Sequence, residues 1–333
     1  MKKEFSLTVL LVAVMAGCGP KTPTQQKVLG PPPGPPSYPP AKAMPIDTPW
    51  QDQARRELDV DLKSSDEVIR AHALEVVKNV KPHDAGSIIS VALNDQSPLV
   101  RKAAALAAGE LREASVQNQL EPMIDSAHTS ERMAIIFALH RMGDTRFSHE
   151  FEKTAIDPDP HLRGDTAMML GMLGEKSAAP ILLQMMNNDH DPSVRLEAAG
   201  ALWELGQESG LEDLVGGTIS AYPDDQMVAL LAIAAPHDTR SLGHVEAQLT
   251  ADYPEVALVA ARAAGMLGSD RGYGVALIGA KSVDQRQRLL AALAFGDIGR
   301  SDSQPVLAKL LTDTDPDVRL AAAGALLQIG NKI

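Results

Sequence analysis

Few residues of the 333-residue chain have the types and spacing that catalysis or metal binding requires. His149-Glu150 is the one adjacent His-Glu pair, and His190 lies between Asp189 and Asp191 in a hydrophilic stretch. We interpret the first as a surface dipeptide and the second as a polar turn. The chain contains no Gly-rich phosphate loop, no His-Glu-x-x-His helix and no Gly-x-Ser-x-Gly elbow. We therefore expect no catalytic residues, no metal ion and no cofactor.

The only cysteine, Cys18, follows a basic start and an apolar stretch over residues 5–17. This stretch is too short to span a bilayer, which takes about 20 residues, and it is typical of an export signal. Residues 15–18, Met-Ala-Gly-Cys, resemble the lipobox of bacterial lipoproteins. The resemblance implies a signal peptide at 1–17, and palmitate or similar acyl chains on Cys18 that anchor the protein in the cell envelope. An ordinary secretory signal with an incidental cysteine is the alternative.

The residue after the cysteine bears on localisation. In the lipoprotein family an Asp at this position retains the protein in the inner membrane of enteric bacteria, and this chain has Gly19. The resemblance therefore implies the outer membrane, with the protein facing the periplasm.

Proline dominates the next segment. Eleven of the 23 prolines lie between Pro20 and Pro49, a density that excludes helix and sheet. Such a chain favours a polyproline-II-like spacer of roughly 3.1 Å per residue. We expect residues 18–48 to be a disordered tether that carries the acylated cysteine. A ligand for a protein partner or for peptidoglycan is the alternative.

The net charge of −12 at pH 7 excludes one class of partner. Residues 51–333 carry −15, because the first 50 residues carry +3. Such a body is repelled by phosphates and anionic headgroups, so we expect no nucleic-acid partner and no membrane contact beyond the lipid anchor. With 44% hydrophobic but only 3% aromatic residues, the core must consist of Ala, Leu, Val and Met.

From about residue 49 the sequence repeats with a period of 31 residues. A good N-cap residue begins six of the nine units, and a proline follows the cap position in six. A glycine ends the helix in six units, 11 residues after a recurrent arginine position. A second apolar segment completes a helical hairpin. We therefore predict an all-α fold, an α-solenoid of about nine hairpins over residues 49–333. The arginine positions are Arg70, Arg101, Arg132, Arg163, Arg195, Gln226, Ala257, Arg288 and Arg319.

The recurrent frame Asp-Pro-x-Val-Arg resembles the HEAT repeats of the armadillo-type fold, in their phycobilisome-lyase-like form. In that family the Asp and Arg of the frame form a polar ladder between neighbouring hairpins. Gln226 and Ala257 replace the arginine in units six and seven, so the ladder should be interrupted there. The resemblance implies ladder pairs at Asp159/Arg163, Asp191/Arg195 and Asp315/Arg319.

Enzymes of HEAT-like fold supply the alternative function. Deoxyhypusine hydroxylase resembles this architecture but uses four His-Glu pairs to hold two irons, and this chain has one. The phycobilin lyases share the repeat, but an exported lipoprotein would be in the wrong compartment for them. We therefore interpret the chain as a protein-binding scaffold and not an enzyme. A HEAT-like enzyme or enzyme accessory, lyase-like or metal-dependent oxidoreductase-like, is the alternative.

The concave face, which the arginine-bearing helices line in HEAT solenoids, is the candidate binding surface. Offsets +2, +5 and +9 from the arginine position point away from the core at 100° per residue. Ten of these positions are large and apolar, and six of the ten lie in units six to eight beside Arg262 and Asp297. We predict that these apolar residues and Arg262 form a groove for a protein or peptide partner, whereas tight curvature that buries the side chains is the alternative. The positions are Leu106, Phe137, Met168, Met172, Val228, Leu231, Val259, Met266, Leu290 and Leu293.

Acidic residues share this face in the N-terminal half, at Glu110, Asp165, Glu197 and Glu204, so we expect a basic or neutral partner there. The last hairpin ends near Gly330 without a polar capping helix. Because terminal repeats normally need a polar outer face, end-to-end self-assembly is a third hypothesis.

Overall fold

The structure is a computed structural model that describes residues 41–125 and 127–331. Cys18, the predicted signal peptide and most of the predicted tether lie outside the described residues. The described part consists of helices and contains no strand, which confirms the predicted all-α fold. It divides into two compact units: unit 1 contains residues 58–207, and unit 2 contains residues 41–57 and 208–331.

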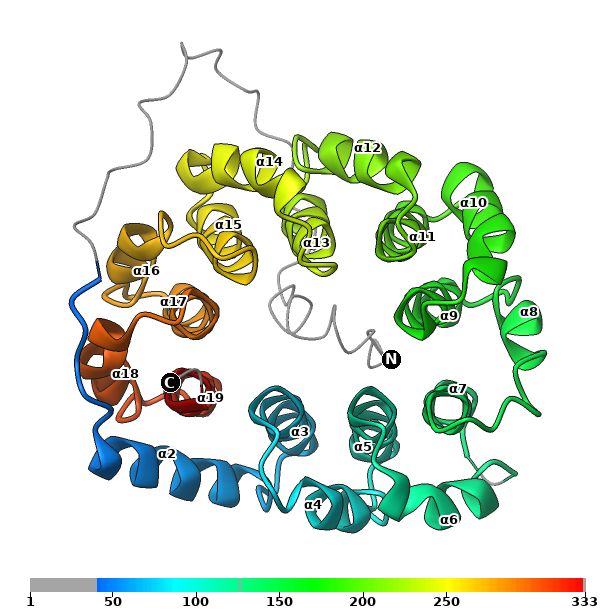
Figure 1. The fold of residues 1–333 in the computed structure, drawn as a ribbon, viewed down its shortest axis with the longest axis horizontal. Coiled ribbons are helices and arrows are strands. Elements are labelled where there is room, and N and C mark those ends of the chain that lie inside the picture. The colour runs from blue at the N-terminus through cyan, green and yellow to red at the C-terminus, as the bar shows by residue number, and fades with distance from the viewer. Residues whose placement is uncertain (1–40, 126, 332–333) are drawn as a thin grey trace. The chain divides into compact units, whose positions relative to one another are not determined.

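Unit 1 has two layers of helices (Figure 1). The inner layer contains the arginine-bearing helices, which are the longer ones, and the outer layer contains shorter helices and 3-10 turns. The inner helices are α3 (Glu67–Val80), α5 (Pro98–Leu111), α7 (Thr129–Arg141), α9 (Pro160–Leu173) and α11 (Pro192–Glu204). The outer elements are α4 (Ala85–Ala92), η2 (Ala114–Val116), α6 (Gln117–Leu120), η3 (Glu121–Met123), α8 (Glu150–Thr154), η4 (Lys176–Ala178) and α10 (Ala179–Asn188).

Unit 2 has the same two layers (Figure 1). Its inner helices are α13 (Pro223–Ala234), α15 (Pro254–Met266), α17 (Gln285–Ile298) and α19 (Pro316–Asn331). Its outer elements are α12 (Glu208–Gly217), η5 (Thr239–Ser241), α14 (Leu242–Glu246), η6 (Ala247–Thr250), α16 (Tyr273–Gly279), η7 (Ser301–Ser303) and α18 (Gln304–Leu310). The first helix, α2 (Thr48–Asp61), belongs to unit 2 as far as Glu57.

The predicted helix ends are largely confirmed. Asp66, Asp159, Asp191 and Asp284 cap α3, α9, α11 and α17, and each accepts a bond from a main-chain N–H in the first turn. The αL stop is also present, for example at Gly174 with φ 74°. Gly330 is the exception, because α19 continues through it to Asn331.

Glycines inside the inner helices allow close approach of the next inner helix. A Cβ on Gly109 would lie 2.8 Å from the Cα of Ala138, and one on Gly171 would lie 2.7 Å from the Cα of Ala201. A Cβ on Gly265 would lie 2.5 Å from the main-chain nitrogen of Ile298. These glycines share the position eight residues after the arginine position. The low aromatic content therefore accompanies helices that pack almost backbone to backbone.

The polar ladder exists, but its acidic partners differ from those that the family resemblance implied. Arg163 pairs with Asp189, through Nε–Oδ2 and Nη2–Oδ1 distances of 2.7 Å each. Asp159 and Asp191 instead accept bonds from the main chain of their own helices, so the predicted pairs are wrong in their carboxylates. The same bidentate pairing joins Arg70 to Asp95 and Arg288 to Asp313.

The arginine position has a second, local role. Arg195 and Arg319 each donate from Nη1 to the carbonyl six residues earlier, at distances of 2.8 and 3.0 Å. Asp315 accepts from the N–H of Val318 at 3.1 Å, so it too caps its own helix. In unit six, Gln226 keeps the local bond, to the carbonyl of Ser220. The glutamine thus keeps the hydrogen bond to the loop carbonyl that arginine makes in other units, but it does not form the bidentate pair with a carboxylate.

The end of the predicted tether and the start of α2 pack on the last hairpin of unit 2 (Figure 1). The N–H of Asp47 donates to Gln304 Oε1 at 2.9 Å, and Gln304 Nε2 donates to the carbonyl of Pro45 at 3.0 Å. Gln51 Nε2 donates to the carbonyl of Leu326 at 2.7 Å. The last hairpin is therefore covered, contrary to the expectation that it lacks a cap.

This packing also explains Gly330. A Cβ there would lie 2.9 Å from Gln51 Oε1, so the glycine makes room for α2 and does not end α19. Glu57 adds an ion pair to Arg319, with a Nε–Oε1 distance of 2.6 Å.

Candidate functional site

The ten apolar positions predicted for a groove do not all reach the surface. Five are buried, so the prediction of an exposed groove is wrong for them: Leu106, Phe137, Met168, Val259 and Leu290. The other five are half-buried: Met172 in unit 1, and Val228, Leu231, Met266 and Leu293 in unit 2.

Tight curvature of the inner layer explains this burial in unit 1. Lys102 on α5 forms an ion pair with Asp165 on α9. These two inner helices are separated by α7. The hydroxyl of Ser130, on the intervening helix α7, donates to the same carboxylate at 3.0 Å. Side chains from three successive inner helices therefore meet at one carboxylate. On the same inner layer, Phe137 of α7 is 0% exposed and its ring packs against Gly109 of α5.

Asp165 is itself buried, at 3% exposure, and so is Lys102, at 5%. Lys102 and Ser130 both donate to Asp165 Oδ2, and Asp165 Oδ1 is buried without a hydrogen-bond partner among the described residues. Buried carboxylate oxygens are normally paired, because an unpaired one has lost its water without compensation. The Oδ1 atom is therefore a buried acceptor in unit 1 that lacks a donor among the described residues.

Glu197 and Glu204 on α11 extend this acidic region. Burial, together with the carboxylates of Asp165 and Glu204, raises the pKa of Glu197 to about 8. Glu204 keeps more solvent contact, and desolvation with the nearby Glu110 raises its pKa less, to about 7. For neither glutamate does the described part of the chain provide a cation within ion-pair distance. We call Asp165, Glu197 and Glu204 the acidic cluster.

Glu110 on α5 differs from the residues of the acidic cluster on α11 because it forms an ion pair with a lysine. Lys78 on α3 pairs with Glu110 at 2.9 Å and with Glu75 at 2.6 Å, and these carboxylates raise its pKa although burial opposes the charge. On α7, Arg141 Nη1 donates to the carbonyl of Met172 at 3.3 Å. Glu110 is therefore neutralised by a lysine, whereas Glu197 and Glu204 on α11 have no such cation among the described residues.

The half-buried apolar residues of unit 2 lie beside a neutralised charge pair. Arg262 on α15 pairs with Asp297 on α17, with a Nε–Oδ2 distance of 2.8 Å. Asp297 Oδ1 also accepts from Gln328 Nε2 at 3.0 Å. Arg262, which was predicted to contact a partner, is therefore already engaged. The apolar row of unit 2 comprises Val228, Leu231, Met266 and Leu293.

The two histidines that the sequence singled out, His149 and His190, are surface groups. His149 is exposed and lies 3.1 Å from Glu150, which also pairs with Lys153 at 2.9 Å. His190 is exposed. Over residues 41–125 and 127–331, no three His, Cys, Asp or Glu side chains are grouped so as to hold a metal ion. None of the helices described is long and apolar enough to span a bilayer.

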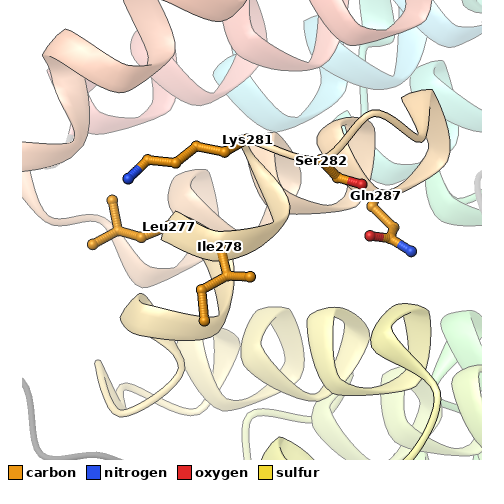
Figure 2. A pocket seen from close by; sticks show the side chains of 5 residues that line it. All are labelled: Leu277, Ile278, Lys281, Ser282 and Gln287. Carbon is orange, nitrogen blue, oxygen red and sulfur yellow. The ribbon is translucent and has the colours of Figure 1, made fainter.

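A shallow pocket of about 510 Å³ lies at the turn between α16 and α17 (Figure 2). Leu277, Ile278 and Lys281 lie at one end of it, and Ser282 and Gln287 lie at the other. Ile278 is 72% exposed, and Gln287 Nε2 donates to Glu255 Oε1 at 3.0 Å. The repeat pattern does not predict this pocket, because its residues belong to the turn and not to the concave offsets of the repeat.

The chain was compared with known proteins. No curated protein sequence matches it. A solved complex of CpcE and CpcF of phycocyanin lyase from Nostoc sp. PCC7120 is similar at 19% identity and a TM-score of 0.45, over 73% of this chain and 97% of that chain. Human deoxyhypusine hydroxylase in complex with glycerol is similar at 16% identity and a TM-score of 0.38, over 85% and 98% of the two chains.

The repeats themselves are recognised directly. HEAT repeats match residues 60–140, 150–235 and 275–332, which is more than half of the chain and includes inner helices of both units. The protein therefore belongs to the HEAT-repeat family.

Proposed function

We propose that this protein is a scaffold lipoprotein of the bacterial cell envelope, anchored through Cys18, whose inner face in unit 1 binds a basic segment of a protein partner. The observation that carries the proposal is the acidic cluster. Glu197 and Glu204 lie on an accessible face, and Asp165 contributes a buried oxygen without a hydrogen-bond donor. A scaffold with this surface needs no catalytic group.

The electrostatics favour a cationic ligand over an anionic or apolar one. Each carboxylate of the cluster disfavours the charge of the next, and this repulsion contributes to the raised pKa of Glu197. A guanidinium or ammonium group would replace repulsion by attraction and would supply the donor that Asp165 Oδ1 lacks. Water excluded by the ligand would strengthen the interaction further.

The apolar row of unit 2 supports the same function independently. Val228, Leu231, Met266 and Leu293 keep part of their surface in solvent on three inner helices. Methionine and leucine side chains of this kind are adaptable contacts for a partner. We propose that apolar residues of a partner bind there.

A binding measurement on the full chain in detergent tests the scaffold function. A fluorescein-labelled hexa-arginine peptide should bind at low salt, whereas a hexa-aspartate peptide should not. The variant Glu197→Gln/Glu204→Gln should weaken binding at least tenfold. Glu152→Gln, an exposed glutamate on outer helix α8, removes one charge elsewhere in unit 1 and should leave binding unchanged. Equal binding by all three proteins would contradict the proposal.

The anchor needs its own test. In a bacterial host, the unmodified chain should incorporate a clickable palmitate analogue and fractionate with membranes. Cys18→Ser should do neither. Membrane association of Cys18→Ser without the label would contradict the proposed lipid attachment.

A further inference from the structure

The two glutamates of the acidic cluster have a fixed spacing. Glu197 and Glu204 are seven residues apart on α11, which is two helical turns or about 10.5 Å. Gly164 and Gly171 on α9 have the same spacing. A Cβ on Gly164 would lie 3.8 Å from Glu197 Cγ, and one on Gly171 would lie 3.0 Å from Glu204 Oε2. Each glutamate therefore lies over a glycine of the neighbouring helix.

The two ends of this arrangement have different surroundings. At the Glu197 end, α9 contributes Asp165, α5 contributes Lys102 and α7 contributes the hydroxyl of Ser130. At the Glu204 end, the neighbouring charge is Glu110 of α5, which Lys78 of α3 already pairs with.

The buried oxygen at the first end is an observation independent of the acidic charges. Lys102 and Ser130 both bind Asp165 Oδ2, and Oδ1 remains without a donor among the described residues. An unpaired buried acceptor beside an accessible carboxylate indicates a place for an incoming N–H group.

We infer that the partner segment carries two cationic side chains about 10 Å apart along α11, one received by Glu197 with Asp165 Oδ1 and the other by Glu204. This inference rests on the proposed binding of a basic segment and specifies its spacing. A polyproline-II segment with two arginines at i and i+3 places them on one side, about 9.3 Å apart. Adjacent arginines point to different sides of such a segment, so they match the spacing of the two glutamates less well than arginines at i and i+3 do.

Proton release provides a second readout. Glu197, with a pKa of about 8, holds its proton at pH 7, and an arginine bound beside it favours the ionised form. Binding of the spaced cations should therefore release a proton. The affinity should rise between pH 6.5 and pH 8.5, because Glu197 becomes ionised in the unbound protein over this range. The titratable groups that act on Glu197 are Asp165 of α9 and Glu204 of α11, and Asp165 is itself paired with Lys102 of α5.

The experiment compares two peptides of one composition, acetylated and amidated: Arg-Pro-Pro-Arg and Arg-Arg-Pro-Pro, each labelled with fluorescein. Anisotropy with the full chain in detergent at low salt should show at least fivefold tighter binding of the spaced peptide at pH 8.5. Glu197→Gln or Glu204→Gln alone should remove this preference, and Glu152→Gln should retain it. Calorimetry at pH 7 in buffers of different ionisation enthalpy should detect proton release with the spaced peptide, and Glu197→Gln should reduce this release to the part that Glu204 contributes.

The contrary outcomes are separable. Equal affinity for the two peptides, both lost in Glu197→Gln/Glu204→Gln, would overturn the spacing and leave the proposed function intact. A preference that survives in both single variants would overturn the assignment to these glutamates. Failure of both peptides and of hexa-arginine to bind would overturn the inference and the proposed function together.

Discussion

Lys102 of α5 and Asp165 of α9 form a buried ion pair that passes over the intervening helix α7. A pair between helices that are not neighbours requires that the inner layer of unit 1 curve tightly. The same curvature encloses apolar side chains that a straighter solenoid would expose. This one contact therefore links the packing of unit 1 to the acidic character of its inner face.

Removal of the lysine should be strongly destabilising. Lys102→Met leaves Asp165 buried without its countercharge, which costs about 3 kcal/mol of unfolding free energy. The double variant Lys102→Met/Asp165→Asn should recover a large part of this loss, because no uncompensated charge remains. Urea unfolding followed by circular dichroism measures both. Equal losses in the single and the double variant would contradict this account.

The stability of unit 1 should fall as the pH rises from about 5 to 8. Glu197 has a pKa of about 8 in the folded protein, against 4.5 for a solvated glutamate in the unfolded chain. The folded state therefore binds the proton of Glu197 more tightly over this pH range. The loss of stability caused by ionised Glu197 is absent below pH 4.5 and complete above pH 8. Glu197→Gln should raise stability at pH 8.5 by about 1–2 kcal/mol, after allowance for its partial exposure, and have little effect at pH 4.5. Thermal unfolding at both pH values tests the difference.

The close helix approach at Gly265 predicts a sharp steric effect. Gly265→Ala would place a Cβ 2.5 Å from the Ile298 main-chain nitrogen, and we expect a loss of about 2–3 kcal/mol. Gly216→Ala is the matched control, since a Cβ there has no neighbour within 4 Å and alanine favours helix by up to about 1 kcal/mol. Similar denaturation midpoints for the two variants would argue against backbone-close packing of α15 and α17.

The arginines of the ladder should contribute more to the free energy of unfolding than arginines exposed on the surface do. Arg163→Ala removes a half-buried bidentate pair that also lowers the pKa of Asp189 through its hydrogen bonds, so we expect a loss of about 1–2 kcal/mol. Arg146→Ala breaks equally short pairs to Asp144 and Glu121, but its side chain is 61% exposed. That variant should change stability much less than Arg163→Ala does, because solvent screens an exposed pair. Differential scanning calorimetry of the two variants checks the ranking.

The attachment of the N-terminal segment depends on Gln304. Its side chain is fully buried and bonds in both directions, accepting from Asp47 and donating to Pro45. Gln304→Ala should increase amide hydrogen exchange at residues 42–47 at least tenfold, because two specific bonds are lost. Exchange in α9 should stay unchanged. Protection of residues 42–47 in the variant would show that these bonds do not hold the segment.

The repeat period and the cap residues were sufficient to predict the hairpins, because a helix signals both of its ends locally. The sequence also predicted acidic residues on the inner face of unit 1. It did not predict which concave positions are buried, since Leu106 and Phe137 depend on a curvature that arises from packing across three helices. The ladder carboxylates were missed for a related reason. Asp189 looked like part of a polar turn, and its partner Arg163 is 26 residues away.

The bonds between residues 42–51 and residues 301–326 span sequence separations of 257 to 275 residues, in a fold whose other contacts are mostly between adjacent repeats. They cannot form until nearly the whole chain has been synthesised. Each hairpin can fold on its predecessor as it emerges, whereas α2 must wait for α19 before its packing is complete. This early segment is thus the last to complete its packing, and a polypeptide truncated before residue 301 would leave it without a surface to bind.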